Sequence, residues 1–547
     1  MKGNFLALVF LLVFSFPSVK SLLATGGYTS HDLTHHVVRQ IDMDRLLGEG
    51  QFPPRWSGEL NNGFGYPLFL FNYPLPPIIG EFFHLIGFNF VSSVKAVLLT
   101  SMIISVVGMY LFLNELFDNK NKLGAFLGAV FYLYAPIRFL NVYVSAALGN
   151  ATALEFLPFV FWAIVLIAKR KKWAMPLGAI ALFALVTSHN VTALMFGPVI
   201  FGFSLILGLR KKNSKQFFKN LLFMFLLGLG LSAFFWIPAL AEKHYIIYEV
   251  ALPGFWKDHF PTFSQLIHSP WGYGLSQPGP DDAISFQIGL TQILVILLTA
   301  PLLIVFRRKK EFLTLGIFSI FFFVLSVFLM LEVSIPVWEN LPLISLVQFP
   351  ARFLAVAVFI SSITASFLVK YLPFNKIAFI FLLALVLYAN RNHLRVNQQF
   401  DPGEDYYLSQ KGTTAFANEH LPKWGYIPKK PASSKIIFLE GKGEIQMTEN
   451  KSAKVSAVIE TSEKAILRFN QFYFPGWSLK VDGKNVEFSY LGEGENKGLP
   501  IFSLGPGSYI FEATFEDTPI RKLADLISLS SFIFLTVYFF YLVRSKR

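Results

Sequence analysis

The sequence predicts a polytopic α-helical membrane protein of about twelve spans, with a small antiparallel β domain outside the membrane before the last span. Three observations lead to this prediction. Apolar residues make up 54% of the 547 residues, the mean hydropathy is +0.52, and 62 residues are phenylalanine. Charged residues make up only 15%, and they cluster between long apolar runs, as membrane topology requires. Near the C-terminus, a long polar segment alternates between apolar and polar residues, which is typical of β-strands.

The apolar runs define the predicted spans. A helix needs roughly 20 residues to cross about 30 Å of hydrocarbon. The predicted spans are 5–24, 91–116, 122–142, 150–168, 173–188, 191–209, 217–240, 284–306, 312–332, 351–371, 375–391 and 521–543. The first of them resembles a secretory signal peptide, but Leu22-Leu23-Ala24 is a poor cleavage site, so we expect an uncleaved span.

Four basic clusters set the predicted orientation. They are Lys169-Arg170-Lys171-Lys172, Arg210-Lys211-Lys212, Arg307-Arg308-Lys309-Lys310 and Arg544-Ser545-Lys546-Arg547. Placing all four in the cytoplasm requires an even number of spans and two cytoplasmic termini in a plasma-membrane protein. The same loops explain the net charge of +13 without nucleic acid as a partner.

The even number of spans also determines whether the proline-rich segment 67–90 crosses the membrane. If it crossed the membrane, the cluster at 169–172 would lie outside. Prolines break helical hydrogen bonding, so we expect an interfacial helix at 76–88 and one continuous external loop over 25–90.

The chain therefore divides into a transmembrane domain at 1–391, an external domain at 392–520, and a last span with a basic tail at 521–547. In the external domain, Tyr509, Phe511, Ala513 and Phe515 alternate with Ile510 and Glu512. Asp482-Gly483 between two apolar runs predicts a hairpin with a type I′ turn. We expect a β-sandwich in the second half of this domain.

The external loop carries the first candidate for chemistry, Asp32, in the run Ser30-His31-Asp32-Leu33-Thr34-His35-His36. If a helix begins near Ser30, His35 lies within one turn of Asp32. A carboxylate beside imidazoles suits a general base, and Asp32 with His35 could also hold a divalent cation such as Mg²⁺ or Mn²⁺. The alternative is a solvated helix start, where Asp32 favours the helix dipole.

Charged residues at the external ends of spans extend this candidate site. Glu155 lies in an apolar run, His189 marks a turn between two spans, and Arg352 begins a span. A guanidinium offers paired donors to phosphate oxygens. The structural alternatives are an ion pair for Glu155, a helix cap near His189 and an interfacial anchor for Arg352. Arg55 and Glu59 belong to the external loop and could join the site.

Several other chemistries are excluded. There is no cysteine, so disulfides, thiolate metal sites and a cysteine nucleophile are absent. The sequence has no Gly-Lys-Ser/Thr phosphate loop, dinucleotide glycine motif or Gly-x-Ser-x-Gly elbow.

Several motifs along the whole length resemble a known group of proteins. They are His31-Asp32-Leu33-Thr34-His35, Gly50-Gln51-Phe52-Pro53-Pro54-Arg55-Trp56, Gly63-Phe64-Gly65-Tyr66-Pro67, Ser188-His189-Asn190, Gln348-Phe349-Pro350-Ala351-Arg352-Phe353, Gly412-Thr413-Thr414, His420-Leu421-Pro422 and Tyr473-Phe474-Pro475-Gly476-Trp477 with Val481-Asp482-Gly483. The chain resembles the YfhO-like bacterial membrane proteins and the related "6-pyruvoyl-tetrahydropterin synthase-related" membrane proteins, which look like members of the GT-C superfamily of glycosyltransferases. A pterin-synthase activity would need a soluble fold and a zinc-binding histidine triad, and the sequence shows neither.

The GT-C resemblance implies a polyprenyl-phosphate-linked sugar donor and transfer outside the membrane. It also implies a catalytic aspartate in the first external loop, a position that Asp32 matches. Many members carry a second acidic residue just before a Pro-Pro pair, whereas this chain has Tyr73-Pro74-Leu75 before Pro76-Pro77. The nearest acids are Glu59 and Glu81, so the second carboxylate is unassigned.

The leading hypothesis is a membrane glycosyltransferase that uses Asp32, with Glu59 as a second catalytic candidate. His31, His35, Arg55, Glu155, His189 and Arg352 are the candidate substrate-binding residues. Its partners would be the bilayer, a polyprenyl-phosphate sugar and an extracytoplasmic glycan, lipid or protein acceptor. The alternatives are a non-catalytic protein of polysaccharide assembly on the same scaffold and, ranked last, a transporter.

Overall fold

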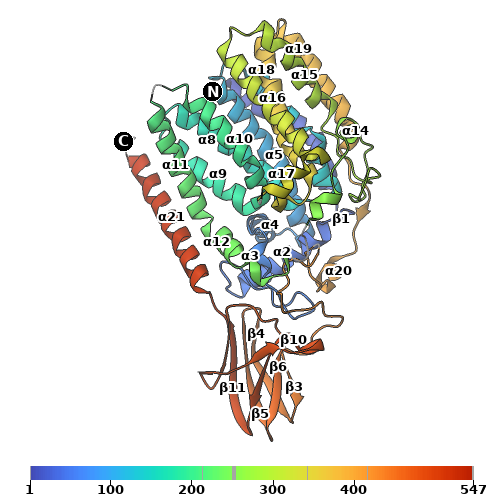
Figure 1. Ribbon diagram of the computed structural model, residues 1–547, viewed down its shortest axis with the longest axis vertical. Coiled ribbons are helices and arrows are strands. Elements are labelled where there is room, and N and C mark those ends of the chain that lie inside the picture. The colour runs from blue at the N-terminus through green and yellow to red at the C-terminus, as the bar shows by residue number, and fades with distance from the viewer. Residues whose placement is uncertain (1, 212, 249–253, 342, 416, 545–547) are drawn as a thin grey trace.

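The computed structural model describes residues 2–211, 213–248, 254–341, 343–415 and 417–544. A bundle of long helices forms one end of the molecule, and a β-sandwich forms the other (Figure 1). The last helix, α21, runs from the sandwich back along the side of the bundle (Figure 1). This arrangement confirms the predicted fold class of a helical membrane protein with a β domain before the last span.

Each predicted span corresponds to a helix or to a bent pair of helices. The long helices are α1 (Lys2–Val19), α5 (Phe90–Leu116), α6 (Lys122–Leu133), α8 (Leu148–Ala168), α9 (Ala174–Ser188), α10 (Asn190–Gly208), α11 (Ser214–Leu231), α12 (Ala233–Ala241), α15 (Leu290–Val305), α16 (Lys310–Met330), α18 (Leu354–Tyr371), α19 (Asn375–Asn390) and α21 (Pro519–Arg544). Among the described residues, seven helices are long and apolar enough to cross a membrane, or nine if each bent pair is one span. The other three predicted spans are α9, α15 and α19, which have only 15 or 16 residues.

The two bent pairs interrupt spans predicted as continuous. In the first, α6 is followed by α7 (Pro136–Phe139) and the π-helical turn η2 (Leu140–Val144), with a bend of 48°. Pro136 cannot donate a backbone hydrogen bond, which removes one helical hydrogen bond and favours a bend at this point. In the second pair, α11 and α12 meet at Ser232 with a bend of 71°.

Short elements cover the end of the bundle that faces the β domain (Figure 1). The first loop forms β1 (Gly27–Tyr28), α2 (Leu33–Gly48), α3 (Leu68–Phe71) and α4 (Leu75–Leu85). The remaining short elements are η1 (Lys20–Leu23), η3 (Lys243–Tyr245), η4 (Phe255–Asp258), α14 (Phe263–Ile267), η5 (Glu332–Ser334), α17 (Ile335–Asn340), η6 (Ile344–Val347), η7 (Pro350–Phe353), η8 (Arg391–His393), β2 (Gln399–Phe400), α20 (Glu404–Ser409) and η9 (Gly494–Asn496). The α4 helix and the turn after it expose Phe82, Leu85, Ile86 and Phe88, as expected of a helix at the membrane interface.

The β domain is an antiparallel sandwich of two sheets. One sheet has the order β3 (Ile436–Glu440), β6 (Ala465–Phe469), β10 (Lys497–Leu504) and β9 (Ser489–Leu491). The other has the order β4 (Gly443–Lys451), β5 (Lys454–Thr461), β11 (Gly507–Phe515), β7 (Trp477–Val481) and β8 (Lys484–Asn485). Phe511 and Ala513 of β11 are buried and Ile510 is exposed, as the alternation predicts.

The predicted hairpin is β7–β8, with Val481 paired to Lys484. Its turn residues Asp482 and Gly483 have φ angles of +49° and +76°. A type I′ turn requires positive φ at both central residues, so the turn chemistry agrees with the prediction.

The first loop and the β domain share one apolar core. Trp56 is fully buried, with its ring 4.9 Å from that of Phe515 and 5.5 Å from that of Trp477. Its indole Nε1 donates to Gln471 at 2.7 Å. Gly65, at a φ of +69°, lies against this indole, and an added Cβ there would come within 2.8 Å of Nε1. The sandwich is therefore packed onto the bundle through this loop.

The basic loops meet at the end of the bundle away from the β domain (Figure 1). Lys169 pairs with Glu115 and Asp118, and Arg210 donates to the carbonyl oxygen of Lys310 at 2.7 Å. The start of α1 and the end of α21 also lie at that end (Figure 1). In the fourth predicted cluster, residues 545–547 lie outside the described part of the chain.

Candidate functional site

Asp32 is the residue immediately before α2, and its backbone is fixed to the bundle. The backbone N–H groups of His31 and Asp32 donate to the carbonyl oxygens of Val144 and Ser145, at 3.1 and 3.0 Å. The side chain of Asp32 makes no capping hydrogen bond to α2, whereas the hydroxyl of Ser30 accepts from Leu33 N at 3.2 Å. Asp32 is therefore held in place without its carboxylate being used to cap the helix.

Two guanidinium groups and two imidazole rings interact electrostatically with the Asp32 carboxylate. Arg39, His35 and His31 interact with it electrostatically, and so does Arg352, from a segment 320 residues later in the chain. Burial raises the pKa of Asp32, and these neighbours oppose that rise. One carboxylate beside the two guanidinium groups of Arg39 and Arg352 leaves an excess of positive charge, which favours an anionic ligand.

The three histidines of this segment lie in different environments. His31 donates through Nε2 to the carbonyl oxygen of Gly274 at 2.9 Å, so that nitrogen is committed to the fold. Burial, and then the charge of Arg39, lower the pKa of His35. His36 is buried, and its pKa falls well below the usual value for the same two reasons, followed by the charge of His35.

Arg39 was not among the predicted site residues, although it lies one turn after His35 on the same helix. Its Nε donates to the hydroxyl of Thr414 at 3.0 Å, and that hydroxyl contacts Tyr66 Oη at 2.9 Å. Thr414 belongs to the Gly412-Thr413-Thr414 motif. This motif therefore orients the second guanidinium of the site.

Arg352 is placed by the strained segment before α18. Gln348 has a φ of +65°, and the turn that follows lets Arg352 Nη1 donate to the carbonyl oxygen of Val347 at 2.8 Å. The side chain of Tyr248 hydrogen-bonds to that of Gln348. Tyr248 and Tyr73 are both electrostatic neighbours of Arg352, and the sequence alone identified neither of them.

His189 lies at the junction of α9 and α10, beside Tyr73. Its Nδ1 accepts the backbone N–H of Thr192 at 3.1 Å, and the two rings are 5.6 Å apart. Burial, and then the charge of Arg352, lower the pKa of His189 to about 3. The ring is therefore neutral, with its proton on Nε2, and it offers a hydrogen-bond donor rather than a positive charge.

Three of the predicted site residues lie elsewhere. Arg55 forms ion pairs with Asp517 and Asp525 at the base of α21. Glu59 pairs with Lys435 at 3.0 Å. Burial by itself would raise the pKa of Glu59, but the charge and hydrogen bond of Lys435, together with the charges of Arg45 and Lys411, lower it. These contacts place both residues at the junction with the β domain.

Glu155 is buried in α8 within the bundle, where Arg138 of α7 is its charged neighbour. Arg138 in turn donates to the hydroxyl of Ser105 at 2.7 Å. Among the described residues, Arg138 is the charged group that acts on Glu155, and Glu155 Oε2 has no hydrogen-bond partner.

Asp42, two turns after His35 on α2, provides a test of the electrostatics of the first loop. Burial is the largest effect and raises the pKa of Asp42 to about 6. The Ser57 hydroxyl and the charge of Arg45 oppose this rise, whereas the charges of Glu49 and Glu59 add to it. Since the pKa is raised in the folded state, its contribution to stability is present below about pH 4 and is lost as the pH rises through about 6.

The Asp42→Asn variant should therefore be more stable than the wild type at pH 8, by an amount on the order of 3 kcal/mol, and by only about 1 kcal/mol at pH 4.5. Thermal unfolding in detergent at both pH values measures this. An identical difference at the two pH values would contradict the buried, titrating carboxylate, and Asp44→Asn on the same helix is the matched control.

The donor set around Asp32 does not suit a metal ion. No group of three or more His, Asp or Glu side chains is close enough to hold one in the described ranges. Around Asp32 itself, Arg39 and Arg352 would repel a divalent cation. The nearby acid Glu81 accepts from Gln40 Nε2 at 3.0 Å between α4 and α2, so it does not supply a second carboxylate beside Asp32.

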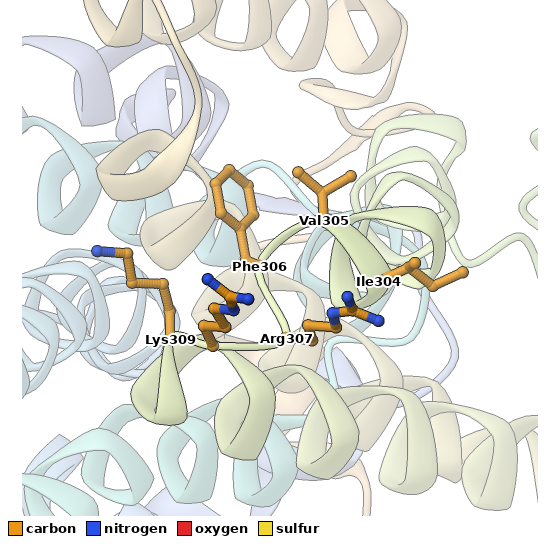
Figure 2. A pocket seen from close by; sticks show the side chains of 6 residues that line it. Ile304, Val305, Phe306, Arg307 and Lys309 are labelled. Carbon is orange, nitrogen blue, oxygen red and sulfur yellow. The ribbon is translucent and has the colours of Figure 1, made fainter.

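Two pockets bear on the choice of site. One lies on the turn between α15 and α16 and is lined by Ile304, Val305, Phe306 and the basic residues 307–309 (Figure 2). It is at the end of the bundle away from Asp32 and contains none of the predicted site residues. The other is only a narrow gap between His36, Arg39, Asn72, Tyr73 and apolar side chains, with no room for a water molecule.

Comparisons with known proteins identify a family and distant structural neighbours. A family model described as "6-pyruvoyl-tetrahydropterin synthase related domain; membrane protein" matches residues 71–396. An uncharacterized protein of Lactococcus lactis subsp. cremoris (strain MG1363) is 25% identical over 259 residues, which cover 46% of this chain and 42% of that protein. The chain thus spans less than half the length of this relative.

Among solved structures, the arabinofuranosyltransferase AftD from Mycobacteria aligns with a TM-score of 0.41 and 15% identity, over 73% of this chain and 27% of AftD. The oligosaccharyltransferase of Archaeoglobus fulgidus aligns with a TM-score of 0.39 and 13% identity, over 77% of this chain and 61% of that enzyme.

Proposed function

This chain belongs to the 6-pyruvoyl-tetrahydropterin synthase related family of membrane proteins, and we propose that it is a glycosyltransferase that moves a sugar from a polyprenyl-phosphate donor to an extracytoplasmic acceptor. The observation that carries the proposal is the single carboxylate of Asp32 among the guanidinium groups of Arg39 and Arg352. The motif resemblance to GT-C enzymes supports the same reading.

The proposed reaction is a direct displacement at the anomeric carbon. Asp32 accepts the proton of the acceptor hydroxyl as its oxygen attacks that carbon. The bond between the anomeric carbon and the phosphate oxygen breaks, and polyprenyl phosphate leaves with the bonding electron pair. Because attack and departure occur on opposite faces, the anomeric configuration inverts.

Arg352 and Arg39 stabilise the phosphate of the donor and the negative charge that develops on it. A guanidinium can present two parallel N–H groups to phosphate oxygens, and one fixed in advance needs little reorganisation during the reaction. Neutral His189 adds an Nε2–H donor next to Arg352. Positioning by these groups and charge stabilisation account for most of the proposed rate enhancement.

The site would face the extracytoplasmic side. The basic loops, the start of α1 and the end of α21 lie at the opposite end of the bundle, which the positive-inside rule assigns to the cytoplasm. Cytosolic nucleotide sugars do not reach such a site, whereas a lipid-linked donor reaches it through the bilayer. The β domain, packed beside the site, would bind or position the acceptor.

The proposal does not require a metal ion, because the two guanidinium groups supply the positive charge at the phosphate. Arg55 and Glu59 are not part of the proposed site, since each pairs with charged residues at the junction with the β domain. Glu155 lies within the bundle near Arg138 and has no role in the proposed reaction.

Mass spectrometry of cell-envelope glycans in a strain lacking this protein tests the function. We expect one glycan, lipid or protein species to lose a sugar, and the corresponding polyprenyl-phosphate sugar to accumulate severalfold. Reintroducing the wild-type chain should restore both. Unchanged glycans together with an unchanged donor pool would contradict the proposal.

A further inference from the structure

We propose that the cavity at the turn between α15 and α16 binds the phosphate headgroup of an anionic membrane lipid, whose acyl chains lie against Ile304 and Val305. The cavity is at the end of the bundle away from Asp32, so this inference does not depend on the proposed function. Its volume is about 540 Å³, and its lining consists of Ile304, Val305, Phe306, Arg307, Arg308 and Lys309 (Figure 2).

The backbone of the turn brings the three basic residues of the cavity together. α15 ends at Val305, and the backbone N–H of Lys309 donates to the carbonyl oxygen of Phe306 at 2.8 Å, which closes the turn before α16 begins. The Phe306 ring packs against the rings of Phe312 and Tyr371, at 5.0 and 5.9 Å. The basic side chains of residues 307–309 therefore come from one tight turn that is held by the neighbouring helices.

The protein does not neutralise these three basic side chains. All three are exposed, and in the part of the chain that the structure describes none of them pairs with a carboxylate. The adjacent acid, Glu311, is engaged elsewhere, since its Oε2 accepts from Lys370 Nζ at 2.5 Å and from Tyr371 Oη at 2.6 Å. Three cations beside one cavity favour an anionic ligand, and the positive end of the α16 dipole at the same turn adds to this attraction.

The length of α15 places the basic turn at the level of the lipid headgroups. This helix corresponds to a predicted span but has only 16 residues. At 1.5 Å per residue it is about 24 Å long, whereas the hydrocarbon core of a bilayer is about 30 Å thick. The turn that follows α15 therefore lies at the edge of the hydrocarbon, where the long side chains of Arg and Lys extend to the phosphate layer.

The apolar part of the cavity distinguishes a lipid from a soluble anion. Ile304 and Val305 are 73% and 68% exposed, so both side chains are available to the acyl chains of the bilayer. A free phosphate ion would contact only the basic residues of the cavity. A lipid with an anionic headgroup contacts both parts, because its phosphate meets residues 307–309 and its chains cover the two apolar residues.

Lipid binding to the delipidated full chain in detergent, measured by native mass spectrometry, tests this site. The probes are phosphatidylglycerol, phosphatidylcholine with the same acyl chains, and inorganic phosphate. We expect the wild type to bind phosphatidylglycerol more tightly than phosphatidylcholine, and excess inorganic phosphate to leave it bound. The triple variant Arg307→Gln, Arg308→Gln and Lys309→Gln should bind phosphatidylglycerol on the order of a hundredfold more weakly, and each single variant about fivefold more weakly.

The matched control is the triple variant Arg170→Gln, Lys171→Gln and Lys172→Gln. It removes the same number of charges from another exposed loop at the same end of the bundle, outside the cavity, and should retain the affinity for phosphatidylglycerol. The single variants remove one charge each, so they decide the question if the triple variant fails to fold.

Three results would overturn the inference. An equal loss of affinity in the two triple variants would mean that the overall charge of this end, rather than the cavity, attracts the lipid. Displacement of phosphatidylglycerol by inorganic phosphate would identify a site for a soluble anion. Equal affinity of the wild type for the two lipids would show that the three basic residues do not select an anionic headgroup.

Discussion

Replacing Asp32 by asparagine is expected to lower sugar transfer by about 10³-fold in membranes, while the protein accumulates at its normal level. A positioned general base contributes typically 10²–10⁴-fold, and an asparagine amide of nearly the same shape cannot accept the proton of the acceptor hydroxyl. The fold should tolerate the change because the side chain of Asp32 does not cap α2 and only its backbone is bonded to the bundle. Transfer is measured as the incorporation of labelled sugar by membranes of the deletion strain that express each variant.

Asp44→Asn is the control for this experiment, since Asp44 lies on the same helix but is not among the charged neighbours of Asp32. Near-normal transfer by Asp32→Asn would eliminate Asp32 as the base. It would then favour the alternative of a non-catalytic assembly protein, which predicts that both Asp32 and Arg352 tolerate substitution.

The sequence was sufficient to predict the architecture because membrane spans and strands are read from local patterns. A helix or a bent pair of helices lies at each predicted apolar run, and seven of these helices, or nine counting each bent pair as one span, are long and apolar enough to cross a membrane in the described part of the chain. Asp482-Gly483 predicted the β7–β8 turn. Two features were not predicted. The bends at Pro136 and Ser232 were missed because a proline or a break within an apolar run leaves its average hydropathy unchanged.

The candidate site was only partly predictable, because its residues meet through contacts distant in sequence. Asp32, His189 and Arg352 could be identified as polar residues at the ends of spans. The orientation of Arg39 depends on Thr414, 375 residues away, and Tyr248 acts beside Arg352 through Gln348. Nothing local to Arg39 or Tyr248 indicates these partners.

For Arg55 and Glu59, the sequence suggested a place in the site around Asp32, but the structure places both residues elsewhere. Their place in the same loop as Asp32 suggested a shared site, but the loop is long enough to reach two different surfaces. Its first part lies on the bundle and its second part lies under the β domain. Residues 55 and 59 therefore pair with Asp517, Asp525 and Lys435, which belong to the later part of the chain.

The junction between the two parts of the molecule depends on a buried ion pair, and we expect Arg521→Met to destabilise the protein by about 3–5 kcal/mol. Arg521 is fully buried at the start of α21, and its Nε and Nη2 donate to Glu242 Oε2 at 3.0 and 2.8 Å. The same Nη2 donates to the carbonyl oxygen of Pro475 in the β domain at 2.8 Å. Removing the guanidinium leaves the Glu242 carboxylate, itself only 3% exposed, as a buried charge whose remaining donor among the described residues is the hydroxyl of Thr518 at 2.7 Å.

The double variant Arg521→Met with Glu242→Leu separates the ion pair from packing. Because the cost of the single substitution comes mainly from the uncompensated carboxylate, removing both charges should restore most of the lost stability. Thermal unfolding in detergent measures stability, and limited proteolysis of the β domain reports its detachment from the bundle. A double variant as unstable as Arg521→Met would show that the hydrogen bond to Pro475 and the packing of Arg521, rather than its charge partner, hold the β domain to the bundle.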